Sequence, residues 1–234
     1  MSDSPEQKTE VAEPVQLAVF DFDGTIMSGQ SGSLFSMWLL RRGLISKRTA
    51  ARLVWWGGRY KLHLPFRQDE SRELIFRDIG KLGYDRTIEL MGEFVDEVLV
   101  PRERPAAVAE VARRSAEGKK CVLVSATFYE MARLAAERLG MDAVAATHMQ
   151  RDERGNLTGR VDGEVVAGEG KVRAVTALAN ARYGEGAWQI ACAYGDHFTD
   201  APLLSLAAEP FVVNPGPTLK RIAARNGWQS LDWK

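Results

Sequence analysis

Residues 17–25 read Leu17-Ala18-Val19-Phe20-Asp21-Phe22-Asp23-Gly24-Thr25. The apolar run predicts a strand buried on both faces, and two carboxylates one residue apart stand at its carboxyl end. Because like charges this close repel each other, we expect a cation to hold them, and hard oxygen ligands favour Mg²⁺. Gly24 permits a tight turn in which its N–H is expected to face an anion.

The same apolar pattern recurs along the chain, each time followed by polar residues. The later runs cover residues 121–124, 190–194 and 211–213. Helical patterns precede and follow the run at 121–124, at residues 108–115 and 131–139. Strands that alternate with helices predict an α/β fold with a doubly wound, Rossmann-like parallel sheet. Such sheets bind ligands beyond the carboxyl ends of their strands.

One long region breaks this alternation and reads as helices only. Helices are expected over residues 34–42, 48–60, 69–80 and 86–99. We therefore predict three parts: a disordered tail at 1–14, an α/β core at 15–27 and 100–234, and a helical cap domain at 28–99. A smaller insert at 147–166 is expected to form a hairpin around Arg154-Gly155-Asn156.

Composition limits the possible partners and compartments. Lys plus Arg and Asp plus Glu each number 31, so the balanced net charge gives no general attraction to nucleic acid. Cys121 and Cys192 lie in apolar runs and are expected to be buried thiols in a reducing compartment. With a polar N-terminus and no apolar stretch of about 20 residues, the chain is expected to be cytoplasmic.

Further polar residues are expected at the same edge of the sheet. Asp196 and Asp200 follow the run at 190–194, Ser125 precedes a helix expected to start near Phe128, and Lys171 begins another helix. Ser125 can cap its helix or bind phosphate, since both use the amide-rich end. An acidic metal pocket that faces a hydroxyl and an ammonium suits phosphoryl transfer.

The residues themselves suggest a mechanism for this transfer. Asp21 is expected to attack phosphorus, while Asp23 protonates the leaving oxygen and later deprotonates the attacking water. A phospho-accepting receiver-like signalling domain and a catalytically silent binding fold are the alternatives from other classes. Asp23 favours hydrolysis because it gives a path for rapid attack by water, and the helical insert favours it because a receiver does not need a cap.

In chain order these motifs resemble the haloacid dehalogenase (HAD) superfamily, particularly its phosphoserine-phosphatase-like branch (subfamily IB), over roughly residues 15–234. The resemblance implies an Mg²⁺-dependent phosphoric monoester hydrolase with an aspartyl-phosphate intermediate and a cap over the substrate. It places the nucleophile on Asp21 and the general acid/base on Asp23. The expected phosphate-binding residues are Ser125, Lys171, Gly24 and Ala126, and the expected metal-binding residues are Asp21, Asp23 (through its backbone carbonyl), Asp196 and Asp200.

Two features of the sequence bear on the identity of the substrate. Gln30 stands where phosphoserine phosphatases carry a glutamate for the substrate amino group, so we expect a small phosphorylated metabolite rather than phosphoserine specifically. Residues 53–64 are rich in aromatic side chains, which we interpret as packing within the cap. The alternative is weak peripheral membrane contact, with a lipid phosphate of the phosphatidylglycerophosphate type as substrate.

Overall fold

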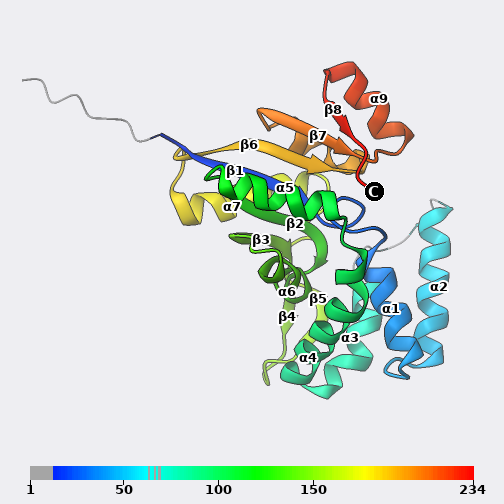
Figure 1. Cartoon of the computed structure of the whole chain (residues 1–234). Coiled ribbons are helices and arrows are strands. Elements are labelled where there is room, and N and C mark those ends of the chain that lie inside the picture. Colours follow the sequence, from blue (N-terminus) through cyan, green and yellow to red (C-terminus); the bar gives the residue numbers. More distant parts are fainter. Residues whose placement is uncertain (1–12, 63, 66, 68–69) are drawn as a thin grey trace, which may run out of the picture.

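The computed structural model describes residues 13–62, 64–65, 67 and 70–234. Its centre is a six-stranded parallel sheet with the strand order β3-β2-β1-β6-β7-β8 (Figure 1). The prediction of a doubly wound α/β sheet is confirmed, and β3 and β8 join the four strands that the sequence predicted. The strands are β1 (Val15–Asp21), β2 (Lys120–Phe128), β3 (Ala143–Thr147), β6 (Trp188–Gly195), β7 (Glu209–Val213) and β8 (Gln229–Leu231).

Helices cover both faces of this sheet. On β1, Ala18 and Phe20 belong to the apolar cluster on one face, and Leu17 and Val19 belong to the cluster on the other. Successive side chains of a strand point to opposite faces, so the continuous apolar run serves both layers at once. The first face carries α5 (Pro105–Ala116) and α6 (Tyr129–Arg138), and the second carries α7 (Glu169–Tyr183), α8 (Ala201–Leu204) and α9 (Pro217–Asn226).

The region between β1 and α5 is helical, as expected, although its division into a separate cap domain remains a prediction. Its two connections to the core run side by side, because Arg104 N–H donates to Ile26 O at 2.8 Å and Ser28 N–H donates to Arg102 O at 3.0 Å. The helices are α1 (Ser31–Arg41), α2 (Lys47–Lys61), α3 (Glu70–Ile79) and α4 (Tyr84–Phe94), followed by a π-helical turn (Val95–Leu99) and a 3-10 turn (Val100–Arg102).

Some expectations fall on residues that the structure does not describe. The expected tail at 1–14 lies outside the described residues except for Glu13 and Pro14. Asp69, the first residue of an expected helix, and His63, in the aromatic stretch at 53–64, also lie outside them. The aromatic stretch on α2 is described, and the prediction that it packs within the cap is wrong for Trp55, whose side chain is 65% exposed. Trp56 is half-buried and donates its Nε1–H to Arg67 O at 2.8 Å.

The predicted hairpin is present and rests on the helical region. It consists of β4 (Met149–Arg151) and β5 (Leu157–Val161), which pair antiparallel. Gly159 lies so close to α3 that a Cβ there would stand 2.7 Å from the Cβ of Phe76. Within the described part of the chain, no helix is both long and apolar enough to cross a bilayer.

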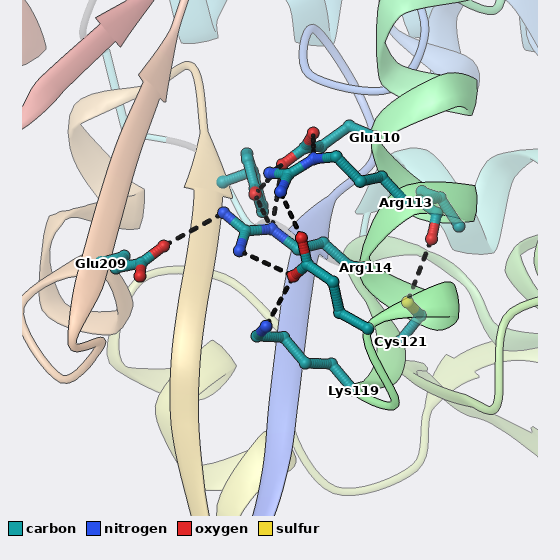
Figure 2. A network of polar contacts seen from close by, with 9 residues as sticks. Glu110, Arg113, Arg114, Lys119, Cys121 and Glu209 are labelled. Atoms are coloured by element: carbon teal, nitrogen blue, oxygen red, sulfur yellow. Dashed lines mark hydrogen bonds and ion pairs between the residues drawn. The ribbon is translucent and has the colours of Figure 1, made fainter.

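A buried polar network fixes α5 against the sheet (Figure 2). Arg114, which is only 4% exposed, donates its Nε–H to the Tyr194 hydroxyl at 2.8 Å and to Glu110 Oε1 at 3.0 Å. The Tyr194 ring stacks on Phe20 with 4.4 Å between ring centroids. Since Phe20 precedes Asp21 and Tyr194 lies two residues before Asp196, this packing sets how the carboxyl ends of β1 and β6 meet.

Both thiols are buried within this layer, and we predict that they are inert in the folded protein. Burial raises the pKa of Cys121 to about 12 and also raises the pKa of Cys192. At about pH 8.5 an aromatic disulfide reagent should therefore leave the native protein unlabelled, whereas the urea-unfolded chain, which has 2 cysteines, should react at both. Equal labelling rates for folded and unfolded protein would contradict this expectation.

The same raised pKa values give the direction of an alkaline effect on stability. Above about pH 8.5 the unfolded chain loses thiol protons that the folded chain retains. The free energy of unfolding is therefore expected to fall as the pH rises through this range.

Candidate active site

Asp21 lies at the carboxyl end of β1 and is held by a buried lysine. Lys171, in the first turn of α7, donates from Nζ to Asp21 Oδ1 at 2.5 Å and to Asp200 Oδ1 at 2.6 Å. All three residues are at most 5% exposed. The second oxygen of Asp21 accepts a hydrogen bond from the Thr25 hydroxyl at 3.0 Å, which fixes the plane of its carboxylate.

Asp196 completes a group of three carboxylates and depends on a glycine. One ligand oxygen from each of Asp21, Asp196 and Asp200 lies within 4.8 Å of the others. A Cβ on Gly24 would stand 2.1 Å from Asp196 Oδ2, so only glycine permits this approach. The Gly24 N–H donates to Met27 O at 2.9 Å, which differs from the expectation that it faces an anion.

Burial and mutual repulsion alter the acidity of these groups. Burial raises the pKa of Asp21 well above its usual range; Lys171 opposes the rise, and the charges of Asp200 and Asp196 add to it. Burial and then the charge of Asp200 raise the pKa of Asp196 to about 6. For Lys171 the attraction of Asp21 and Asp200 outweighs burial and raises its pKa, so the ammonium stays charged. The site thus has an excess of negative charge that a cation would relieve.

The described carboxylates fit a divalent metal by their chemistry and spacing. Three oxygen donors converge, hard cations prefer such ligands, and the lysine neutralises only part of their charge. The expectation that one cation holds the carboxylates of both Asp21 and Asp23 is wrong for Asp23, whose side chain is not in this group of three because it points to Ser31. A metal contact from Asp23 would therefore use its backbone carbonyl, as the resemblance implied.

Asp23 is oriented by the first residue of α1. Ser31 donates its N–H to Asp23 Oδ1 at 2.7 Å and its hydroxyl to Asp23 Oδ2 at 2.8 Å. The Ser31 hydroxyl also lies 3.0 Å from Thr127 Oγ1, which links Asp23 to the end of β2. Burial raises the pKa of Asp23 although the two Ser31 hydrogen bonds oppose the rise. A raised pKa favours a carboxyl group that can carry a proton.

Ser125 precedes α6 as expected, but it lies within β2 and not at the end of the strand. β2 extends to Phe128 and α6 begins at Tyr129, so Ser125 lies within the strand and not at the start of the helix. The Ser125 hydroxyl accepts the Thr127 N–H at 3.1 Å, which rules out the interpretation that it caps α6. It stands on β2, the neighbour of the strand that carries Asp21.

Three contributors escaped the sequence analysis. Thr25 lies in the first motif, but its contact with Asp21 depends on the turn that follows β1. Ser31 carries no charge and belongs to no sequence motif, and its role comes from its two hydrogen bonds to Asp23. Arg72 of α3 donates to Ala126 O at 2.6 Å, across 54 residues of sequence, and no local pattern could indicate this contact.

The chain matches the family of haloacid dehalogenase-like hydrolases over residues 18–205, and it belongs to that family. It is similar to a phosphoserine phosphatase of Mycobacterium tuberculosis, with 28% identity over 221 residues that cover 93% of this chain and 70% of the relative. A histidinol-phosphatase of Neisseria meningitidis is 24% identical over 230 residues, which cover 93% of this chain and 99% of the relative.

A solved structure agrees with the fold. A protein of unknown function from Bordetella pertussis superimposes with a TM-score of 0.84 and 28% identity, over 94% of this chain and 99% of that one. The predicted resemblance to the phosphoserine-phosphatase-like branch is confirmed, and the family together with the phosphatase names of the relatives supports a phosphoric monoester hydrolase.

We predict that Gly24→Ala lowers kcat/KM about 100-fold, since an added Cβ must displace Asp196 and small misplacements in a site have effects of this size. Gly118→Ala is the matched control. Gly118 also has a positive φ, 81° against 90°, but nothing lies within 4 Å of its added Cβ. Both variants should lose about 1–2 kcal/mol from backbone strain, measured by urea unfolding. Equal activity of the two variants would contradict the close-approach argument.

Proposed function

We propose that this protein is an Mg²⁺-dependent phosphatase that hydrolyses a small phosphomonoester through an aspartyl-phosphate on Asp21. The observation that carries the proposal is the group of Asp21, Asp196 and Asp200 around the Lys171 ammonium. A carboxylate can attack a negatively charged phosphoryl group only where positive charge surrounds both.

The metal site in this proposal is formed by the side chains of Asp21, Asp196 and Asp200 with the backbone carbonyl of Asp23. Bound Mg²⁺ would supply the charge that offsets repulsion between the carboxylate and the phosphoryl oxygens. Asp200 also has a supporting role, because its Oδ2 accepts the His197 N–H at 3.0 Å and holds the loop that carries Asp196.

Two chemical steps follow from the positions of the aspartates. In the first, an oxygen of Asp21 bonds to phosphorus, the ester P–O bond breaks, and protonated Asp23 gives its proton to the leaving oxygen. In the second, Asp23 takes a proton from water, whose oxygen bonds to phosphorus and releases phosphate and free Asp21. The Ser31 hydrogen bonds keep the Asp23 carboxyl oriented through both steps.

The phosphoryl oxygens would be bound by Lys171, by the Ser125 hydroxyl and by the Ala126 N–H. Lys171 is suited to this because its charge is retained despite burial. Gly24 contributes by admitting Asp196 and not by its own N–H, which is already paired.

We further propose that residues 28–99 act as a cap. Arg72 of α3 already reaches the Ala126 carbonyl, so the helical region is in contact with the chain segment that follows Ser125. Closing a helical layer over the substrate would exclude water. The substrate is a small phosphorylated metabolite; phosphoserine and histidinol phosphate are compounds to test because relatives carry those names.

A receiver-like signalling domain would use a similar acidic pocket but would retain its phosphate. Asp23, oriented by Ser31 and with a raised pKa, gives a path to rapid hydrolysis. Release of many equivalents of phosphate per protein chain would separate the phosphatase from a receiver, which would release no more than one.

Metal removal and one substitution test the proposal together. Turnover of a phosphomonoester panel, containing phosphoserine, histidinol phosphate, sugar phosphates and phosphatidylglycerophosphate, should require Mg²⁺ and stop in excess chelator. Asp21→Asn should abolish phosphate release with every substrate, because the amide is a poor nucleophile. Full activity of either the chelated enzyme or this variant would refute the proposal.

Asp23→Asn should separate the two chemical steps. With p-nitrophenyl phosphate the leaving group needs little protonation, so Asp21 should still be phosphorylated while water attack slows. Acid-quenched protein should therefore carry radiolabelled phosphate that wild type does not accumulate and that Asp21→Asn never acquires. Ser31→Ala, which keeps one of the two hydrogen bonds to Asp23, should give an intermediate amount. If Asp23→Asn protein neither carried radiolabelled phosphate nor released phosphate, the prediction that Asp23 acts separately in the second step would be wrong.

A further inference from the structure

The charge of this neutral chain is unevenly distributed, and α2 lies at the centre of the imbalance. Between Asp23 and Asp69 there are 45 residues without a single Asp or Glu, and they include eight Lys and Arg residues. Lys plus Arg and Asp plus Glu number 31 each over the whole chain, so the acidic residues are concentrated elsewhere. The region of α1 and α2 is therefore cationic although the protein as a whole is not.

The outer side of α2 exposes large apolar side chains. Val54 is 77% exposed, Trp55 is 65% exposed, and Leu62, which directly follows the helix, is 71% exposed. The side chains of Thr49 and Leu53 lie on the inner side, where Thr49 donates its hydroxyl to Asp78 at 2.7 Å. With 3.6 residues per turn, Ala51, Trp55 and Leu62 fall on one narrow stripe of the exposed side.

Basic side chains lie beside this stripe, and they are exposed to a binding partner. Arg52 is a neighbour of Trp55 on the helix surface at a spacing of three residues. Arg48 and Lys47 lie two turns before Trp55 and Val54, on the same side of the helix. All three cations are exposed, and among the residues that the structure describes they form no ion pair. In contrast, Arg42, which directly follows α1, and Arg59 of α2 form ion pairs with glutamates.

We propose that the outer face of α2 docks on an anionic lipid surface. This face consists of Lys47, Arg48, Ala51, Arg52, Val54, Trp55 and Leu62. A helix that presents Trp and aliphatic side chains between Lys and Arg, without acids, lies in the headgroup region with its apolar stripe inserted and its cations at the lipid phosphates. A second copy of this chain fits the face poorly, because apposed α2 helices would bring like charges together without any acid to pair them.

The position of α2 permits such docking. In Figure 1 it forms the outer edge of the helical region, away from the sheet and from α5, α7 and α9. Its outer side can therefore meet a flat surface without displacing the core. The outer face of α2 is separate from the cluster of Asp21, Asp196 and Asp200. Lipid binding by this face therefore does not depend on the proposed phosphatase chemistry.

Vesicle co-sedimentation of the full chain tests the proposal. The probes are vesicles of phosphatidylcholine alone and of phosphatidylcholine with about 30% phosphatidylglycerol, at low and high salt. Wild type should bind the anionic vesicles, and binding should weaken with salt. Arg48→Gln with Arg52→Gln should weaken it by about 25-fold, at about fivefold for each cation. Val54→Ser with Trp55→Ser should also weaken it, by removing inserted apolar area.

Matched controls come from other exposed positions. Lys220→Gln with Arg221→Gln removes two exposed cations from α9, and Leu206→Ser removes a side chain that is 55% exposed. Both controls should bind vesicles like wild type. Thermal unfolding should be unchanged in every variant, because all the substituted side chains are exposed.

Three results would overturn the proposal. One is wild-type protein that does not bind anionic vesicles, or that binds both vesicle types equally. Another is undiminished binding by the two α2 variants. The third is a wild-type dimer in sedimentation velocity that dissociates in the Val54→Ser, Trp55→Ser variant, which would assign the face to a second copy of the chain.

Discussion

The contact of Lys171 with Asp21 and Asp200 is the interaction around which the site is arranged. Removing three charged groups from water costs free energy, and the lysine offsets this only because both carboxylates lie within 2.6 Å of its Nζ. One ammonium cannot balance three carboxylates, so the site retains an affinity for further positive charge. The same excess of negative charge that makes the cluster costly to bury makes it suitable for a metal ion.

The parallel sheet explains how residues so distant in sequence meet. Asp21, Asp196 and Ser125 come from three strands that run in one direction side by side, so their carboxyl ends share one edge. Packing beneath this edge maintains the alignment: Phe20 and Tyr194 stack across β1 and β6, and Arg114 ties Tyr194 to α5. The alignment of Asp21 and Asp196 therefore depends on the apolar and aromatic side chains that lie one or two residues before them in β1 and β6.

The helical region combines two surfaces with different properties. Its inner side meets the core through Ser31, which orients Asp23, and through Arg72, which contacts Ala126. Its outer side, on α2, is cationic and apolar and has no acidic residue. A protein with balanced overall charge can present such a face because its acidic residues lie before residue 24 and after residue 68 of the chain.

Sequence alone determined the fold class, the four main strands, the helices in the described part of residues 28–99, the hairpin and three carboxylates that converge, those of Asp21, Asp196 and Asp200. These follow from local patterns, since a buried strand needs a continuous apolar run and a hard cation needs oxygen donors. Only the tertiary structure decided the contacts of Asp23 with Ser31, of Gly24 with Asp196 and of Arg72 with Ala126. It also placed Ser125 inside β2 and left Trp55 exposed, because helical spacing specifies which side chains share a face but not what packs against that face.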